Sequence, residues 1–423
     1  MNYPDSVRYL YSLGNELKTI KFGLATITTL MAALGNPERA CRFVHVAGTN
    51  GKGSTCAMIE SALRAAGVRT GLYTSPHLAE PTERIRINGD QVTAQQFADA
   101  FDIVHAAAER LLQSGAIEHH PTYFETVTAM GFVLFAREGV ETAVLEVGMG
   151  GRLDATNIVT PALSVITRID FDHEAFLGRS IEAIASEKAG ILKPGVPAIF
   201  APQRPEAETT LRERAAALAS PLSSVRDWHA GDCEFDPRGS RFMARKEGED
   251  PVAVSCPLAG EHQVENALTA VACLRHLGVD ISAVERGIAA TRWPGRLELI
   301  STSPEIILDG AHNPSGARAL VCYMERFYAD RKICIMYGAM RDKSVVEMTG
   351  VLFPSAHTII ATAPAQERAT RPETIRDLSG RADTIVAATV PEALSIVRQF
   401  VPDMVTFVTG SLFVVAEARS ALI

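Results

Sequence analysis

The stretch VHVAGTNGKGSTCAMIESALRAAG, residues 44–67, decides the fold of this chain. An apolar run ends at Ala47, and a loop with three glycines and a lysine follows it. From Ser54 onwards apolar residues recur at helical spacing, and Gly67 is placed to end the helix. The stretch therefore predicts a strand, a loop and a helix in the order found at phosphate-binding turns.

The loop departs from the standard GxxxxGK[ST] pattern at two positions. Val46 stands five residues before Gly51, and Gly53 follows Lys52. Free backbone NH groups, a helix N-terminus and an ammonium group are nevertheless present, and these are the physical requirements for holding phosphates. We therefore predict a triphosphate site made by Asn50, Gly51, Lys52, Gly53 and Ser54. The alternative is a glycine-rich turn with a solvated lysine, which the flanking strand and helix disfavour.

Length and composition are those of a globular enzyme. A chain of 423 residues is long enough for two domains. The net charge of -8 is spread over interspersed acidic and basic residues, which disfavours a nucleic-acid partner. The seven cysteines form no CxxC pair, the N-terminus has no signal-peptide pattern, and no apolar run reaches the roughly 18 residues of a membrane span. We expect a cytoplasmic protein with no membrane partner.

Apolar runs alternate with helical patterns through the first 295 residues, which predicts a parallel sheet. The candidate strands are residues 42–47, 69–73, 142–147, 162–167 and 196–200. Residues 203–260 are more polar, and we expect a small, mostly β or irregular insertion there.

Pro294 and Gly295 interrupt the pattern and mark the expected domain boundary. The predicted domains are residues 1–295 and 296–423. Alternation of strands and helices resumes in the second domain, which is the smaller of the two. Its candidate strands are residues 305–309, 332–338, 358–364 and 405–410.

Polar residues follow several strands of the first domain. A triphosphate site needs Mg²⁺, which prefers oxygen ligands, and ligands bind beyond the carboxyl ends of parallel strands. Ser75, Glu146 and His173 stand at such ends, on the edge expected to carry Lys52. Each has an ordinary structural interpretation when taken singly, but their joint placement favours a magnesium site. Lys188 lies on a predicted helix, where a lysine is normally solvated, and its spacing leaves its role open.

Eight motifs together resemble one known family. They are HVAGTNGKGST, LYTSPHL, ERIRING, LEVGMGGRLDATN, DHEAFLG, SEKAGILKPG, GRLE and LDGAHNP, and they occur in the family's order over nearly the whole chain. The sequence is similar to the folylpolyglutamate synthase and dihydrofolate synthase family, within the ATP-dependent Mur-type ligases. The resemblance implies an α/β fold with an N-terminal P-loop domain, a smaller Rossmann-like C-terminal domain and a reaction in the cleft between them.

The resemblance also implies roles for individual residues. Lys188 matches a lysine that the family carries as a carbamate, and Ser75, Glu146 and His173 match its Mg²⁺ positions. Beyond the loop, the positions that match ATP contacts are Asn266, Arg296 and Asp309. The positions that match the pterin pocket are Thr122, Tyr123, Phe124, Glu125, Leu153, Asp154 and Ala155. His312 has two open interpretations, as a residue that orients the incoming glutamate or as one that stabilises a turn.

The family reaction joins L-glutamate to a folate precursor at the expense of ATP. The resemblance implies Mg²⁺ as cofactor, dihydropteroate or folates, L-glutamate and ATP as small-molecule substrates, and a monomer. Two departures stand out: the segment ITRIDFDH is more acidic than the common form, and Tyr123 replaces another frequent aromatic residue. The alternatives are an enzyme that only lengthens the glutamate tail, a Mur-type cell-wall ligase, and a P-loop kinase or regulatory NTPase.

Overall fold

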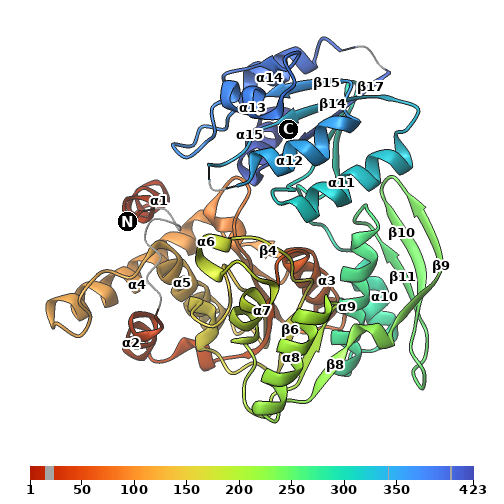
Figure 1. Cartoon of the computed structure of the whole chain (residues 1–423). Helices are drawn as coiled ribbons and strands as arrows, with labels where there is room; N and C mark the ends of the chain where they lie inside the picture. Colours follow the sequence, from red (N-terminus) through yellow and green to blue (C-terminus); the bar gives the residue numbers. More distant parts are fainter. Residues whose placement is uncertain (15–22, 342, 401–402) are drawn as a thin grey trace.

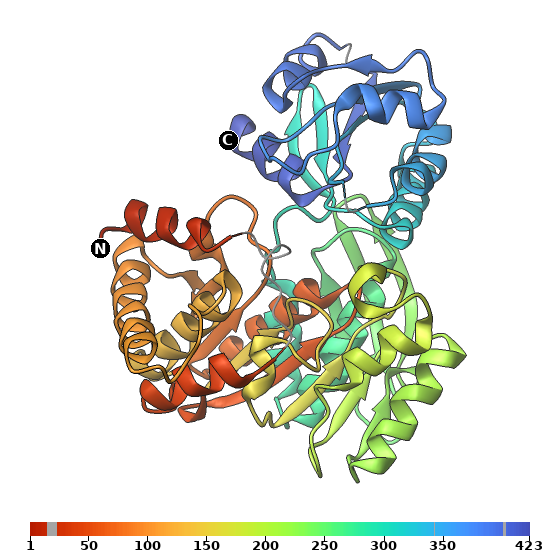
Figure 2. The ribbon, with the colours of Figure 1, turned by 60° about the vertical axis from the view of Figure 1, so that its left-hand side comes forward.

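The computed structural model describes residues 1–14, 23–341, 343–400 and 403–423. Two large sheets organise these residues, one in each half of the chain. Figure 1 shows the half coloured red to green below the half coloured blue, and Figure 2 shows the same arrangement after rotation. The predicted α/β fold with two sheet-based parts is therefore confirmed.

The N-terminal sheet has eight strands in the order β4-β3-β2-β5-β1-β6-β7-β8. Six of these strands run parallel to one another, namely β2, β5, β1, β6, β7 and β8. Strands β3 and β4 add an antiparallel edge. All five strands predicted for this domain are present. The bounds are β1 Arg42–Ala47, β2 Thr70–Tyr73, β3 Ile85–Ile87, β4 Asp90–Gln91, β5 Thr142–Glu146, β6 Leu163–Ile166, β7 Ala198–Phe200 and β8 Leu222–Ser224.

Helices cover both faces of this sheet because its central strands are apolar on both sides. In β1, Val44 and Val46 belong to the core with α3, whereas Phe43 packs with α5 on the opposite face. One face carries α3 (Lys52–Ala65), α9 (His262–His276) and α10 (Ile281–Ala289). The other carries α4 (Ala94–Gln113), α5 (Tyr123–Arg137), α7 (Ile181–Ala189) and α8 (Pro205–Ala217), with α1 (Tyr3–Ser12) and α2 (Ala25–Ala33) against α4.

The prediction for residues 203–260 is wrong in its first part. Residues 205–217 form helix α8, and β8 then adds an edge to the large sheet. Helix α8 begins at a proline, carries glutamates in its first turn and buries Ala207, Leu211 and Ala215. The rest is β structure as expected, a three-stranded antiparallel sheet of β9 (His229–Asp236), β10 (Gly239–Arg245) and β11 (Val252–Cys256).

The C-terminal sheet has six strands in the order β12-β13-β17-β14-β15-β16. Only β12 runs antiparallel to its neighbour, and all four predicted strands are present. The strands are β12 Glu298–Thr302, β13 Glu305–Leu308, β14 Lys332–Tyr337, β15 Thr358–Ala361, β16 Ile385–Val386 and β17 Met404–Thr409. Helices α11 (Pro314–Phe327), α12 (Val345–Leu352) and α13 (Pro372–Ser379) cover one face, and α14 (Val390–Val397) and α15 (Leu412–Leu422) the other.

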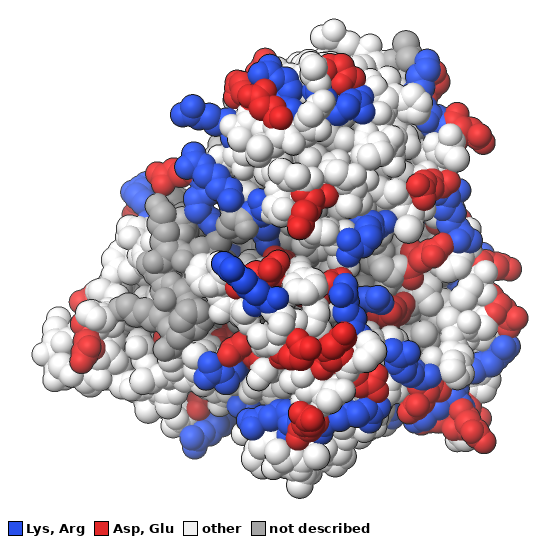
Figure 3. Space-filling model, viewed as in Figure 1, with Lys and Arg blue, Asp and Glu red and all other residues white. Residues whose placement is uncertain are grey.

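The boundary between residues 295 and 296 stays a proposal; it lies in the segment that joins α10 to β12. On the face shown in Figure 3, acidic and basic side chains are interspersed over both halves of the molecule. None of the helices in the described ranges combines the length and the apolar character needed to cross a membrane.

Candidate active site

The predicted phosphate loop lies between β1 and α3, as the opening stretch of sequence indicated. Gly51 caps α3 with φ +87°, and a Cβ there would lie 2.2 Å from Oδ1 of Asn266, so only glycine fits. The ammonium of Lys52 donates hydrogen bonds to the carbonyl oxygens of Gly48 and Thr49, at 3.1 Å each. The Lys52 side chain therefore folds back over the loop and is held by the loop's own carbonyl oxygens.

Gly53, where the standard motif has serine or threonine, lies against an indole ring. A Cβ on Gly53 would come within 3.0 Å of Cζ2 and Nε1 of Trp293. Trp293 belongs to the segment between α10 and β12 that leads into the second sheet. The departure from the standard motif therefore has a steric reason, because the segment between α10 and β12 packs directly on the first turn of α3.

Ser75 and Glu146 follow neighbouring strands and meet at the edge of the sheet. The backbone NH of Ser75 donates to Oε2 of Glu146 at 3.2 Å, while the Ser75 hydroxyl oxygen is buried and has no hydrogen-bond partner within the described ranges. Burial raises the pKa of Glu146, and the nearby Lys52 opposes that rise. A buried carboxyl group near the loop lysine and an unpaired hydroxyl therefore line the same cavity as the phosphate loop.

Lys188 is buried, contrary to the ordinary expectation for a helical lysine. Only 4% of the residue is exposed, and its ammonium donates to the carbonyl oxygen of Gly48 at 2.9 Å. Burial and the charge of Lys52 lower the pKa of Lys188 to about 7. Near neutral pH the amine is therefore partly uncharged and nucleophilic.

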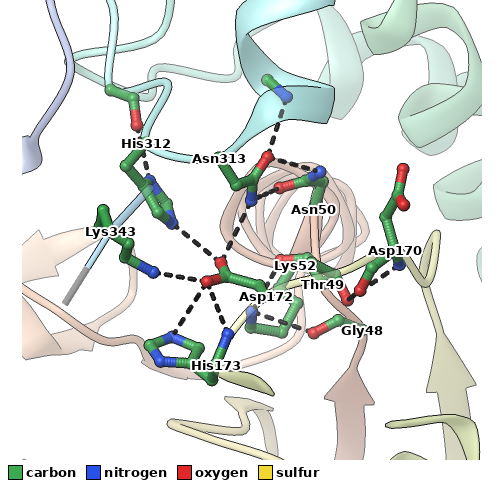
Figure 4. Close-up of polar contacts among 12 residues, drawn as sticks. Gly48, Thr49, Asn50, Lys52, Asp170, Asp172, His173, His312, Asn313 and Lys343 are labelled. Atoms are coloured by element: carbon green, nitrogen blue, oxygen red, sulfur yellow. Dashed lines mark hydrogen bonds and ion pairs between the residues drawn. The ribbon is translucent and has the colours of Figure 1, made fainter. Parts of the chain in front are cut away.

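Asp172 reaches across the cleft to the C-terminal half of the chain, as Figure 4 shows. Its carboxylate accepts hydrogen bonds from Nζ of Lys343 and, at 3.1 Å, from Nδ2 of Asn313, and it lies 3.4 Å from Nε2 of His312. Burial alone would raise its pKa, but His312 and Lys343 outweigh burial and hold it well below the usual range. Asp172 therefore stays ionised in the cleft.

A second contact joins the two halves beside the phosphate loop. The side-chain amides of Asn50 and Asn313 pair reciprocally, at 2.9 and 3.4 Å (Figure 4). Oδ1 of Asn313 also accepts from the backbone NH of Gly316 and so caps helix α11. The loop and the N-terminus of α11 therefore share one polar network.

Asp309 and Arg296 lie where the chain passes from the first large sheet to the second. The buried carboxylate of Asp309 accepts hydrogen bonds from the backbone NH groups of Leu297 and Ala311, at 3.1 and 3.0 Å. Burial raises the pKa of Asp309, and Arg296 lowers it. Arg296 lies close enough to Glu146 to lower the pKa of that residue as well, so its guanidinium belongs to the same site.

Two adjoining cavities hold these residues. The larger, about 640 Å³, is lined by the phosphate loop together with Glu146, Lys188, Asn266, Arg296 and Asp309. We call it the phosphate cavity. The smaller, about 250 Å³, which we call the acceptor cavity, contains Phe124, Leu153, Asp154 and Ala155. Ser75, His173 and His312 line both, so the cavities adjoin at these side chains.

The predicted pterin residues divide into two groups. Thr122 and Glu125 line the acceptor cavity but also form a capping box, since the Thr122 hydroxyl accepts from the Glu125 NH and the Glu125 carboxylate accepts from the Thr122 NH. Tyr123 does not line the cavity. Its buried ring stacks on Tyr11, with the guanidinium of Arg84 5.2 Å from the ring centroid.

Comparison with known proteins decides the family. Residues 46–274 match the model of the Mur ligase middle domain, and residues 295–412 match that of the Mur ligase, glutamate ligase domain. The folylpolyglutamate synthase of Lacticaseibacillus casei is 34% identical over 100% of this chain and 99% of its own. The chain belongs to the folylpolyglutamate synthase and dihydrofolate synthase family. The dihydrofolate synthase/folylpolyglutamate synthase of Bacillus subtilis is also 34% identical, over 99% of both chains.

Solved structures of folylpolyglutamate synthases share the whole fold. The Mycobacterium tuberculosis enzyme complexed with ADP has a TM-score of 0.94 and 30% identity, with 99% of this chain and 98% of that chain covered. Escherichia coli FolC in complex with DHPP and ADP has a TM-score of 0.89 and 30% identity, with 100% and 97% covered. The predicted family and the prediction of an ATP-dependent ligase are confirmed.

The sequence did not identify all the polar groups of this synthase's cleft. Asp170, Asp172 and His173 all follow the strand that ends at Ile166, but only His173 was predicted to belong to the site, and neither Asn313 nor Lys343 was singled out. The acidic character of this segment was the available signal for Asp172. The structure gives His312 a turn contact, because Nδ1 donates to the carbonyl of Gly310 at 2.8 Å, and Nε2 lies 3.4 Å from Oδ2 of Asp172. A role of His312 in orienting the incoming glutamate stays a prediction.

Proposed function

We propose that this enzyme joins L-glutamate to dihydropteroate, giving dihydrofolate, and also to the glutamate tail of reduced folates. The observation that carries the proposal is the shared wall of the two cavities at Ser75, His173 and His312. A nucleotide phosphate and an acceptor carboxylate can meet there. The ADP and DHPP named for the Escherichia coli relative support the same assignment of the two cavities.

The reaction requires activation because a carboxylate anion does not react with an amine in water. In the proposed reaction the acceptor carboxylate attacks the γ-phosphate of ATP, ADP leaves, and the amine of L-glutamate then displaces phosphate from the acyl phosphate. Catalysis of the first step depends on positioning and on neutralising charge at the transferred phosphoryl group. Lys52 from the loop and Arg296 from the second domain supply positive charge on two sides, and Asn266 and Asp309 shape the nucleotide end of the phosphate cavity.

Mg²⁺ is part of the proposal, and its fit rests on the donor set. The unpaired buried hydroxyl of Ser75 and the carboxylate of Glu146 are oxygen donors suited to Mg²⁺, and His173 lies on the same wall. Within the described ranges no three His, Cys, Asp or Glu side chains gather as a metal site, so nucleotide phosphates would complete the coordination. The bound ion would neutralise phosphate charge.

We propose that Lys188 works as a carbamate. Its buried, partly neutral amine can attack CO₂ and lose a proton, which converts a cation beside Lys52 into an anion. The carbamate anion on Lys188 attracts the ammonium of Lys52, whereas an ammonium on Lys188 repels it. Carbamylation therefore removes an unfavourable contact. The carbamate oxygen would add a hard ligand to the phosphate cavity, which Lys188 lines together with Ser75 and Glu146.

The remaining parts of the proposal concern assembly and location. We propose a monomeric cytoplasmic enzyme whose partners are these small molecules and not nucleic acids. Light scattering of the purified protein at two concentrations, with and without added DNA, tests the monomeric state and the absence of a nucleic-acid partner. Fractionation of cells tests the cytoplasmic location.

The decisive experiment supplies MgATP, L-glutamate and either dihydropteroate or a reduced folate. ADP release is followed continuously, and incorporated glutamate is measured by mass spectrometry. Products from both acceptors are expected. Elongation of folate alone would make the enzyme a tail-lengthening synthase and remove the pterin assignment of the acceptor cavity. ADP release without incorporation would favour another Mur-type ligase or an NTPase.

A further inference from the structure

A chain of hydrogen bonds runs from the core of the N-terminal sheet to the wall of the acceptor cavity. It begins at His45 in β1, which is fully buried, and passes through Thr156 to Asp154. Nε2 of His45 lies 2.8 Å from the Thr156 hydroxyl oxygen, and that hydroxyl lies 2.5 Å from Oδ1 of Asp154. Among these three residues only Asp154 lines the cavity.

The direction of each bond follows from counting protons. The Thr156 hydroxyl has one proton, and a carboxylate oxygen can only accept, so the hydroxyl donates to Asp154. The hydroxyl must then accept from His45, which fixes the proton of that imidazole on Nε2. Nδ1 of His45 is buried without a hydrogen-bond partner within the described ranges. An unprotonated Nδ1 suits that position, because a buried N–H donor without an acceptor would cost more free energy than a buried nitrogen lone pair without a donor.

The protonation state of His45 is constant across working pH. Burial, and to a lesser degree the charge of Lys193, lowers the pKa of His45 to about 3. The imidazole therefore stays neutral, and its single proton stays committed to Thr156. The link between the core and the cavity does not titrate in the range where the enzyme works.

Asp154 needs this support because it is buried. Burial raises its pKa, and hydrogen bonds from Thr156 and from the backbone NH of Met149 oppose that rise. The Thr156 hydroxyl and backbone NH both donate to Oδ1, the latter at 3.0 Å, and the backbone NH of Met149 donates to Oδ2, also at 3.0 Å. Oδ2 therefore lies beside Gly148 and Met149 and accepts from the loop that they form. Gly148 and Met149 line the acceptor cavity.

We propose that His45 and Thr156 are positioning residues that hold the Asp154 carboxylate ionised and oriented, so that its remaining acceptor position receives an N–H group of the acceptor's ring. A fused heterocycle with neighbouring ring and exocyclic N–H donors, flat enough to lie beside Phe124, is the ligand chemistry that fits. The inference rests on the proposed function, since it deepens the assignment of the acceptor cavity.

Matched variants separate the hydrogen bonds from packing. Thr156→Val removes the hydroxyl and keeps the shape, whereas Thr156→Ser keeps the hydroxyl. His45→Met removes the donor, whereas His45→Gln places an amide N–H near the position of Nε2. We expect KM for dihydropteroate to rise about tenfold in Thr156→Val and His45→Met, as for loss of one hydrogen bond to a charged group. Thr156→Ser and His45→Gln should stay within about twofold, with KM for ATP and L-glutamate unchanged in all four.

A second measurement does not depend on the variants folding. In the full-length enzyme with ¹⁵N-labelled histidine, the His45 resonances should show protonated Nε2 and unprotonated Nδ1 from pH 5 to 8. An imidazolium or the Nδ1–H tautomer would overturn the proposal. Equal KM for dihydropteroate in the Thr156→Val and Thr156→Ser enzymes would overturn it as well.

A third variant separates this proposal from the proposed function. Asp154→Asn should weaken dihydropteroate binding, measured directly by fluorescence titration. If binding is unchanged, the acceptor does not lie against Asp154 and the assignment of the cavity fails. A different outcome is that Asp154→Asn weakens binding, while KM for dihydropteroate is the same in Thr156→Val as in Thr156→Ser and the same in His45→Met as in His45→Gln. The cavity assignment then holds, and the positioning role of His45 and Thr156 is wrong.

Discussion

Lys343 of the C-terminal half donates a hydrogen bond to Asp172, which follows the N-terminal strand β6, and so the two halves of the molecule meet at a buried carboxylate (Figure 4). The side chains of Asp172 and Lys343 are only 8% and 12% exposed. Ion pairs at this depth are costly to break on one side, because the remaining charge loses its partner. The contact therefore ties closure of the cleft to charges that line the reaction site.

The first prediction concerns this contact. Asp172→Asn should speed hydrogen exchange of the amides near Asn313 by about tenfold or more, because Lys343 and His312 lose their charged partner and the halves separate more often. Hydrogen-exchange mass spectrometry of the nucleotide-free enzyme measures it. Asp403→Asn, which breaks the exposed pair with Lys332, is the matched control. Equal protection in the two variants would contradict the prediction.

The second prediction concerns the unusual phosphate loop. Gly53→Ser restores the standard GKS motif but places a side chain against Trp293. Overpacking of this kind typically costs about 1–3 kcal/mol, so we expect ATP affinity, measured by calorimetry, to fall about tenfold. The double variant Gly53→Ser/Trp293→Leu should recover most of the loss. A Gly53→Ser enzyme with ordinary ATP affinity would show that the indole does not constrain the loop.

The third prediction concerns the buried lysine. The folded-state pKa of Lys188, about 7, lies below its ordinary value, so the unfolded chain binds more protons than the folded one between pH 7 and about 10. Burying the charge thus destabilises the fold below pH 7, and the cost fades as pH rises through this window. In CO₂-free buffer, Lys188→Met should gain roughly 2–4 kcal/mol in unfolding free energy at pH 7 and less at pH 9.5.

Denaturant titrations at both pH values measure this gain, and activity should be lost in the same variant. Lys193→Met is the control, since Lys193 is less buried and lies outside both cavities. A gain that does not shrink between pH 7 and pH 9.5 would mean that the amine is not the source of the cost.

The fourth prediction concerns Arg296. A Cβ on Gly310 would lie 2.2 Å from Nη1 of Arg296 and 2.4 Å from Cδ2 of Leu412, so Gly310→Ala must displace the guanidinium. We expect kcat to fall at least tenfold while the melting temperature changes by a few degrees at most, since a long side chain can yield. Gly350→Ala, on helix α12 with open space around it, should leave kcat unchanged. Similar kcat values in both variants would remove Arg296 from the phosphoryl-transfer step.

The sequence predicted the parts of the fold whose signals are local. Strand β1, the loop and helix α3 follow one another directly, and the apolar runs that became β13 and β17 are equally plain. Helix α8 was missed because its exposed face is highly charged and its buried face consists mainly of small alanines. Local pattern alone carries little information about such a helix.

The site was predictable where a residue follows a strand and not where distant segments meet. Asp172 and Lys343 are 171 positions apart, and no spacing rule relates them. Tyr123 illustrates a different difficulty. It stands next to Phe124 in the sequence, but neighbouring helical residues point in different directions, and here Phe124 lines the cavity whereas Tyr123 does not.

The common wall of the two cavities also matters for inhibitor design. Ser75, His173 and His312 border both the nucleotide side and the acceptor side, so the two sides share these side chains. We expect a single compound with a flat heterocycle at one end, a phosphonate in the middle and a nucleoside at the other to contact both cavities and these shared side chains. Such a compound would gain the chelate advantage of two linked ligands.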